Sequence, residues 1–440
     1  MRSASSVNPV SPYCTGCGAC VAPSCGKLTM DWDGDGFLIP IRTSDESLPK
    51  EVLQACPFKP QGTGGVSSDE DVLAKHIFPD ASRSDEEIGL FENTYIGYSR
   101  QHRPTSSSGG IATYMFEKIL NEGTADHLFV VVPEGAHYAY TLLSAPVGGT
   151  AISKTRYFPV TLQDLFVRIR SMEGRIAVSG VACFVKAVRM RQAEDADFAA
   201  KVSFVVGIIC GGLKSSFFTD YLADRAGAGI GHHSEEYRVK DAASTSNDYS
   251  FSALDANDNP HQMKMRIVGD MWGTGLFKAR ACDYCTDVLT ELADISLGDA
   301  WLPEYRKDGL GNSVIVTRSK LSDEIVRRGI LSHELATEQC APARVVESQR
   351  SSFLHRRDAL GFRIGVAKLM RQPVPYARKR LLKRITFLYA LVQIQREVTR
   401  RLSFSAWRRT RSASAFERRL RPHLRLLRIL TRINQRFRHR

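Results

Sequence analysis

The feature that most constrains this chain is a run of cysteines near its start. Two residues separate Cys14 from Cys17, and two separate Cys17 from Cys20. A fourth cysteine, Cys56, is followed directly by Pro57. A cubane iron–sulfur cluster needs four thiolates that converge on one centre, and a C-x2-C-x2-C loop presents three of them while a distant Cys-Pro supplies the fourth. The pattern therefore predicts one [4Fe–4S] cluster held by Cys14, Cys17, Cys20 and Cys56.

We interpret residues 1–62 as a ferredoxin-like iron–sulfur segment, because bacterial ferredoxins use this arrangement of cysteines. The alternative is a zinc ribbon, although that site uses two separated C-x2-C pairs rather than three evenly spaced cysteines. The sequence assigns no role to Cys25, which lies in the same segment, or to Cys340.

The compartment can be inferred from the N-terminus and from the number of cysteines. The first residues contain no apolar stretch of the kind found in a secretory signal, so we expect the ten cysteines to lie in a reducing, cytoplasmic compartment. No run approaches the roughly 18 apolar residues that a membrane-spanning helix needs.

Charge divides the chain into two unequal parts. Residues 371–440 contain 21 Lys and Arg and two acidic residues, a formal charge of +19, whereas the remaining 370 residues carry −6. Arginines alternate with apolar side chains in this last part, which predicts a basic amphipathic helical tail that lies on an anionic membrane surface. Nucleic-acid binding and a solvated extension are the alternatives, and the apolar side chains favour the membrane over nucleic acid.

A second set of four cysteines is scattered through the middle of the chain. Cys183 and Cys210 each follow an apolar segment that reads as a buried strand, and Cys282 and Cys285 form a C-x2-C pair. Carboxyl ends of parallel strands meet at one edge of a sheet, where open α/β proteins place their sites. These four cysteines could therefore meet and hold a second cluster, although each single cysteine is also compatible with plain core packing.

The rest of the body alternates strands and helices, which predicts an α/β (α+β) fold with a mixed sheet over residues 86–370. The polar, Ser- and Asp-rich residues 242–258 are expected to form a surface loop. Residues 61–70 and 81–87 read as a linker between the iron–sulfur segment and the body.

Several of these motifs resemble the coenzyme F420 hydrogenase/dehydrogenase beta-subunit family, which includes a plant chlorophyll-cycle reductase. The similarity spans roughly residues 10–340 and rests on CTGCGAC (14–20), SSSGGI (106–111), the Gly180–Cys183 turn, Cys210-Gly-Gly and, above all, CDYCTDVLTELADISLGDAW (282–301). The family usually has Gly-Thr-Pro-Cys-Gln where this chain has Gly180-Val-Ala-Cys183-Phe, which leaves the cysteine in place and puts in doubt the contacts of the glutamine.

The resemblance implies an oxidoreductase in which FAD lies beside a [4Fe–4S] cluster, with the scattered cysteines as ligands of that cluster. Two segments independently suit a flavin: a glycine-containing turn that begins a helix can bind a pyrophosphate, and a strand that ends in Gly-Asp can accept hydrogen bonds. An ordinary helix cap and an ordinary strand-terminal turn remain the alternatives. Lys278 and Arg280 could face a reduced flavin or a cluster, or could be solvated surface charges. The expected cofactor-binding residues are Ser107, Ser108, Gly109, Gly110, Lys278, Asp294, Gly298 and Asp299.

We therefore expect an iron–sulfur flavoprotein that passes electrons between two [4Fe–4S] clusters, FAD and a small-molecule or glycan substrate. Coenzyme F420 or ferredoxin is the candidate electron carrier, and the inner membrane face is the candidate site of peripheral contact. A non-catalytic electron-transfer subunit of a larger complex is one alternative, and a zinc-bearing nucleic-acid-binding protein is another.

Overall fold

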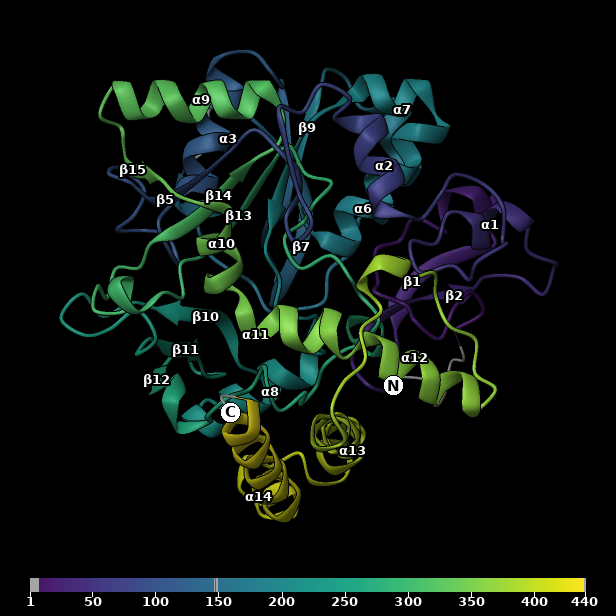
Figure 1. Cartoon of the computed structure of the whole chain (residues 1–440), viewed down its shortest axis with the longest axis vertical. Helices are drawn as coiled ribbons and strands as arrows, with labels where there is room; N and C mark the ends of the chain where they lie inside the picture. The colour runs from purple at the N-terminus through teal and green to yellow at the C-terminus, as the bar shows by residue number, and fades with distance from the viewer. Residues whose placement is uncertain (1–7, 146, 148, 439–440) are drawn as a thin grey trace.

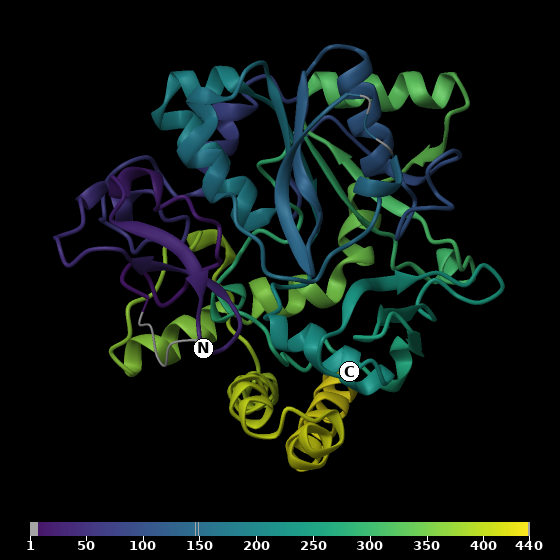
Figure 2. The same cartoon turned by 180° about the vertical axis from the view of Figure 1, so that it is seen from behind.

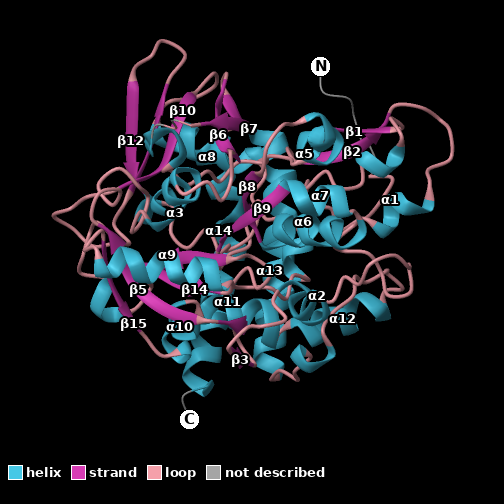
Figure 3. Cartoon of the chain, turned by 90° about the horizontal axis from the view of Figure 1, so that it is seen from above, coloured by secondary structure: helices cyan, strands magenta, loops and turns pink. Residues whose placement is uncertain are grey.

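The centre of the molecule is an eight-stranded mixed sheet with helices on both faces (Figures 1 and 3). The computed structural model describes residues 8–145, 147 and 149–438. The strand order is β15-β5-β14-β13-β9-β8-β6-β7. The strands are β5 (Asn93–Ser99), β6 (His127–Glu134), β7 (His137–Ser144), β8 (Ile176–Val181), β9 (Val202–Ile208), β13 (Ile295–Asp299), β14 (Ser313–Thr317) and β15 (Leu335–Gln339).

Four neighbouring strands of this sheet, β6, β8, β9 and β13, run parallel, and every other neighbouring pair in the sheet is antiparallel. The parallel strands read as continuous apolar runs because both of their faces are covered: Phe204, Val205 and Val206 of β9 are all buried. The carboxyl ends of β8, β9 and β13 consequently lie at one edge of the sheet.

Each face of the sheet has its own hydrophobic core. Helices α3 (Ile111–Asn121) and α9 (Lys320–Leu331) cover one face, and α5 (Gln163–Arg168), α6 (Ala182–Glu194) and α7 (Ala196–Lys201) cover the other. The amphipathic pattern of α3 explains its place, since Ile111, Met115 and Ile119 recur on one side of the helix and are fully buried. The predicted mixed α/β fold is confirmed.

The N-terminal part is a small unit beside the body (Figure 2). Its hairpin pairs β1 (Leu28–Trp32) with β2 (Leu38–Arg42), and the short helix α1 (Lys50–Gln54) precedes Cys56. Helix α2 (Glu70–Ile77) lies between the two stretches expected to form a linker, and strand β3 (Arg83–Asp85), within the second stretch, pairs with β4 (Gly89–Phe91).

The surface loop expected over residues 242–258 is wrong in part. A three-stranded sheet is formed by β10 (His233–Val239), β11 (Ser250–Leu254) and β12 (Pro260–Lys264), with β11 in the middle. The alternation Ser-Phe-Ser-Ala-Leu in β11 buries Phe251 and Ala253 against helix α8 (Ser216–Ala226). Two apolar side chains within a polar stretch are a weak signal for a strand.

The expected helical tail is present from residue 387 to residue 438, whereas residues 371–386 are mostly irregular, and much of this part packs against the body. Helices α13 (Phe387–Thr410) and α14 (Ala413–Arg438) lie side by side at one end of the molecule (Figure 1). Trp407, Phe404 and Phe416 are buried in one core with residues of α8 and β11. No described helix has both the length and the hydropathy that crossing a bilayer requires.

The segment between α12 (Leu360–Leu369) and α13, residues 370–386, also contacts the body. Arg378 is fully buried, and its guanidinium pairs with Glu291 at 2.7 Å and Asp71 at 2.9 Å. The helices between β15 and this segment are α10 (Pro342–Ser348), α11 (Arg350–Phe353) and α12, with a π-helical turn over Leu354–Asp358. The remaining short helix is α4 (Gly149–Ile152).

Candidate functional site

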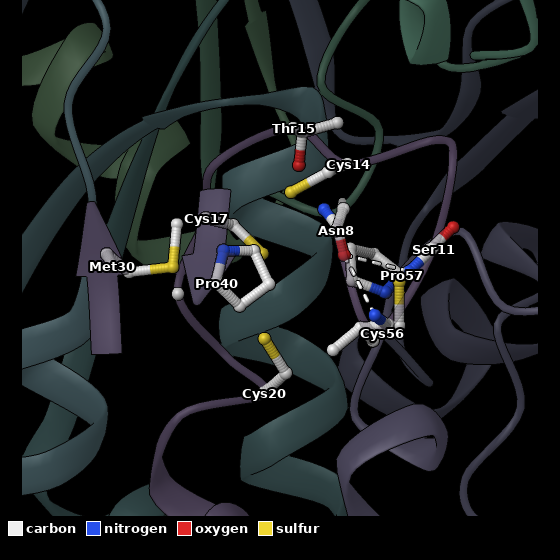
Figure 4. A pocket seen from close by; sticks show the side chains of 12 residues that line it. Asn8, Ser11, Cys14, Thr15, Cys17, Cys20, Met30, Pro40, Cys56 and Pro57 are labelled. Carbon is white, nitrogen blue, oxygen red and sulfur yellow. Dashed lines mark hydrogen bonds between the residues drawn. The ribbon is translucent and has the colours of Figure 1, made fainter. Parts of the chain in front are cut away.

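The first cysteine quartet lines a pocket in the N-terminal unit. Figure 4 shows the side chains of the four cysteines around this pocket, with Met30 and Pro40 of the hairpin at its side. The glycines between the cysteines have left-handed backbones, with φ of 77° at Gly16 and 81° at Gly18, so the loop can turn back after each cysteine. The spacing therefore brings Cys14, Cys17, Cys20 and Cys56 together as the sequence predicts.

These thiols interact with one another electrostatically. Burial, followed by repulsion from Cys17, Cys14 and Cys56, raises the pKa of the Cys20 thiol well above its usual value. Burial also raises the pKa of Cys14 and of Cys56 to about 12. Four thiolates this close together in a buried pocket are stable only with a cation or a cluster between them.

The second quartet meets at the carboxyl edge of the large sheet. Cys183 follows β8 at the start of α6, Cys210 follows β9, and Cys282 and Cys285 come from the turn before β13. Burial, followed by repulsion from Cys285, Cys282 and Cys210, raises the pKa of the Cys183 thiol well above its usual value. The structure thus brings together four cysteines that are up to 102 residues apart in the sequence.

Hydrogen-bond donors surround the sulfur atoms of the second quartet. The backbone N–H of Gly212 donates to Cys210 Sγ at 3.2 Å, and that of Leu213 donates to Cys282 Sγ at 3.1 Å. The Arg356 guanidinium donates to Cys285 Sγ at 2.6 Å and to the Cys210 carbonyl at 2.7 Å. Arg356 comes from the π-helical turn, which directs both Arg356 and Arg357 into the interior.

Lys278 is buried beside this quartet and is paired within the protein. Its ammonium group lies 2.5 Å from Asp283 Oδ1 and 2.8 Å from His355 Nε2, and Arg400 of α13 approaches the same carboxylate at 3.5 Å. Arg280 bonds to Gln372 and lies over the Tyr13 ring. Lys278 therefore orders the turn that carries Cys282, and neither basic side chain is a solvated surface charge.

The two quartets are neighbours. The rings of Tyr13, next to Cys14, and Tyr284, between Cys282 and Cys285, are in edge contact with centroids 4.6 Å apart. Cys17 and Cys183 belong to the same hydrophobic core. Among the described residues, no group of three or more His, Cys, Asp or Glu has the arrangement that a single metal ion requires.

The SSSGG turn holds two of the predicted cofactor residues in protein contacts. Ser107 Oγ accepts a hydrogen bond from the Thr155 N–H at 2.9 Å, and Ser108 Oγ donates to the Asn312 carbonyl at 3.1 Å. Gly110 has a φ of 77° and caps α3. A Cβ at Gly109 would lie 2.7 Å from the Gly97 carbonyl oxygen, so close packing against β5 by itself requires a glycine there.

Ser106, the residue before these, has a buried hydroxyl without a hydrogen-bond partner among the described residues. Nearby, the Nε atoms of Arg156 and Arg238 are likewise buried and unpaired within the described part of the chain. Buried polar atoms are rarely left unpaired in proteins, and a polar ligand bound at this turn would supply partners for these three.

Basic side chains gather around the same turn. Lys240 donates to the carbonyls of Ser108 and Leu310, at 3.0 Å and 2.9 Å, and also to that of Arg103. Burial and repulsion from Arg238, Arg103 and Lys154 lower the pKa of Lys240 to about 7. A bound phosphate group would relieve this repulsion.

The predicted acidic residues lie at opposite ends of β13. Asp299, at the carboxyl end, pairs with Arg238 at 2.6 Å, and Gly298 makes room for Ile209 on the neighbouring strand. Asp294, at the amino end, accepts from Arg189 at 2.8 Å and from the Val205 N–H. Asp299 therefore lies at the same edge of the sheet as Cys210. Asp294 lies at the opposite edge, where it pairs with Arg189.

Aromatic rings connect the basic region to the second quartet. Tyr157 is half-buried, and its pKa is raised by desolvation first and then by Tyr249, Asp299 and Cys210. It contacts Trp272 with ring centroids 4.9 Å apart, and a Cβ on Gly211 would lie 3.4 Å from the Trp272 ring. Sequence reasoning missed Arg238, Lys240, Tyr157 and Trp272, because no short motif contains them.

The fold and the two quartets define a class, an α/β protein with paired cysteine sites. Within that class, residues 173–343 match the model of a protein family, namely the C-terminal region of the beta subunits of coenzyme F420 hydrogenase/dehydrogenase. This match covers the second quartet and confirms the resemblance inferred from the motifs.

Comparison with solved structures supports the same fold. The chain is similar to one from the F420-reducing [NiFe] hydrogenase complex of Methanosarcina barkeri, with a TM-score of 0.51 and 21% sequence identity. The similarity covers 67% of this chain and 100% of that chain. No curated protein matches the sequence. Residues 173–343 are thus similar in sequence to this family, and about two thirds of the chain shares the fold of this hydrogenase-complex chain.

Proposed function

We propose that this protein is an FAD-dependent oxidoreductase with two [4Fe–4S] clusters, one in each cysteine quartet. The observation that carries the proposal is the convergence of Cys183, Cys210, Cys282 and Cys285 at the carboxyl edge of the sheet, beside a buried basic region with unpaired polar atoms. When bound, the clusters and the flavin would supply one-electron and two-electron transfer.

The roles of the residues follow from their contacts. Ser106, Arg156 and Arg238 would hold the phosphates of the flavin, and Asp299 would orient Arg238. The half-buried rings of Tyr157 and Trp272, which contact each other, would lie between this region and Cys210. Arg356 and the N–H groups of Gly212 and Leu213 would stabilise the negative charge on the sulfur atoms.

The partners proposed for this oxidoreductase are an electron carrier, such as ferredoxin or coenzyme F420, and a small-molecule or glycan substrate. Ten free cysteines support a cytoplasmic location. Peripheral contact with an anionic membrane through residues 371–440 is part of the proposal, and a non-catalytic subunit of a redox complex remains the second candidate.

Iron and sulfide analysis tests the proposal. Protein reconstituted under anaerobic conditions should contain about eight iron atoms and eight acid-labile sulfides per chain. Cys14→Ser and Cys183→Ser should each reduce both numbers to about four, whereas Cys340→Ser, which alters neither quartet, should retain about eight. A full preparation with only about four irons would contradict the two-cluster proposal, and a colourless, zinc-containing protein would contradict the redox function altogether.

A further inference from the structure

Helix α14 has an apolar stripe that the rest of the described chain leaves uncovered. Its buried side packs on α8 and α13 through Phe416, Leu420 and Leu427. Four large apolar side chains on the helix are exposed nonetheless: Leu426 (46%), Ile429 (54%), Ile433 (36%) and Phe437 (62%). Their spacing of three and four residues places them along one face, which differs from the buried face.

Arginines flank this stripe and are not neutralised within the protein. Seven arginines of α14 are exposed, and none forms an ion pair within the described residues: Arg418, Arg419, Arg421, Arg425, Arg428, Arg432 and Arg436. The single acidic residue of the helix, Glu417, faces α8, where it pairs with Arg225 at 2.9 Å and accepts from the Tyr221 hydroxyl. The exposed face therefore carries basic and apolar side chains and no acidic residue among the described residues of the helix.

The position of the helix leaves this face accessible. α13 and α14 form one end of the molecule along its longest axis, and α9 lies at the opposite end (Figure 1). Burial of Trp407 and Phe416 beside α8 fixes the orientation of α14, so the stripe is held outward by a rigid body.

We infer that this face of α14 binds the surface of an anionic lipid bilayer, with Leu426, Ile429, Ile433 and Phe437 inserted among the acyl chains. The flanking arginines complement lipid phosphates. The apolar stripe favours a bilayer over nucleic acid, because binding to nucleic acid would not require exposed apolar side chains. This inference does not depend on the cofactors, because no residue of the stripe belongs to either cysteine site.

Vesicle cosedimentation of the full-length holoprotein tests the inference. We expect binding to phosphatidylcholine vesicles that contain phosphatidylglycerol, and little binding to phosphatidylcholine alone. Salt should weaken the interaction without abolishing it, since the inserted side chains add a salt-resistant component.

Two pairs of substitutions separate the apolar from the electrostatic contribution to vesicle binding. Ile429→Asn with Ile433→Asn should remove the salt-resistant binding, and Arg425→Gln with Arg432→Gln should weaken low-salt binding by about an order of magnitude or more. The matched controls lie on α9 at the other end: Leu321→Asn with Leu331→Asn, and Lys320→Gln with Arg327→Gln. All of these side chains are exposed, and the control pairs should leave vesicle binding unchanged.

Other outcomes would overturn the inference. Absence of binding to anionic vesicles at low salt would do so, as would equal losses in the α9 controls. A dimer in solution that Ile429→Asn dissociates would assign the stripe to a second copy of the chain. Binding to duplex DNA without vesicle binding would assign the arginines to nucleic acid. Unchanged iron and flavin contents establish in each case that the variant is folded and that the redox proposal is unaffected.

Discussion

Arg356 distinguishes the two cysteine sites at the level of single residues. Its guanidinium donates to Cys285 Sγ, whereas in the N-terminal quartet the Cys14 sulfur accepts from the backbone N–H of Gly16 at 3.4 Å. A cationic donor stabilises the more negative, reduced form of a cluster and so raises its reduction potential. We therefore expect electrons to pass from the N-terminal site to the second site.

Replacing Arg356 should lower the potential of the second cluster. A charge-assisted hydrogen bond that contributes about 1.4 kcal/mol corresponds to a shift of about 59 mV for one electron, so Arg356→Gln should lower the midpoint by that order. An EPR-monitored redox titration measures both midpoints. Arg357→Gln is the control, because the Arg357 guanidinium binds the Glu291 carboxylate and backbone carbonyls instead of sulfur; an equal shift there would argue against a specific role for Arg356.

Ser106 and Ser107 provide a similar comparison for the flavin. Ser106→Ala removes a hydroxyl with no partner among the described residues, so it should weaken FAD retention with little change in stability. Ser107→Ala removes the acceptor of the Thr155 N–H and should lower stability by about 1 kcal/mol instead. Flavin stoichiometry after gel filtration and thermal unfolding of both variants test this. Full retention of FAD by Ser106→Ala would remove Ser106 from the proposed phosphate site.

At the scale of elements, α13 belongs to the core of the body. Trp407 is only 2% exposed, and its ring lies 5.9 Å from that of Tyr221 on α8 and 5.8 Å from that of Phe416 on α14. A chain that ends at Gln372 would lose this packing and the Arg378 guanidinium that neutralises Glu291, so it is not expected to fold stably.

Removing most of the Trp407 side chain should therefore destabilise the folded protein. Trp407→Ala should lower the free energy of unfolding by about 3–5 kcal/mol, because it leaves a cavity between α8, α13 and α14. Phe437→Ala, at an exposed position of α14, should change it by about 0.5 kcal/mol or less. Urea unfolding followed by circular dichroism compares the two variants, and similar midpoints would mean that α13 is not integrated into the core.

The sequence predicted the site best where the functional residues are close together in a recognisable spacing. The first quartet could be predicted because three of its cysteines lie in one short loop, whereas for the second the apolar strands before Cys183 and Cys210 only suggested a shared edge, and the ligand set rested on the family resemblance. The packing of α13 could not be predicted, since a helix with many arginines has the composition of a surface element whether or not Trp407 is buried. Arg356 escaped notice because a π-helical turn has no spacing rule that would direct it inward.

At the scale of the whole molecule, the two quartets lie close together, so clusters bound in them would be expected to interact magnetically. The Tyr13 and Tyr284 rings, whose centroids are 4.6 Å apart, belong to residues adjacent to ligands of different proposed clusters. Fully reduced protein should therefore give an EPR spectrum broadened by coupling between two paramagnetic clusters. Cys14→Ser should simplify it to the spectrum of an isolated cluster, whereas a wild-type spectrum equal to the sum of two isolated signals would contradict this closeness.

The buried contacts of the C-terminal segment also impose an order on the biogenesis of the protein. All four cysteines of the first quartet have been synthesised by residue 56, but Asp283 beside the second quartet meets Arg400, and Glu291 meets Arg378, only near the end of translation. The cysteines proposed to hold the first cluster are thus all present while the ribosome is still working, although Cys17 and Tyr13 meet Leu162 and Pro373 only later. The second site reaches its final surroundings only once nearly the whole chain has emerged, so a chain that stalls or ends soon after Cys285 would hold all eight cysteines of the two quartets without the C-terminal contacts that surround the second one.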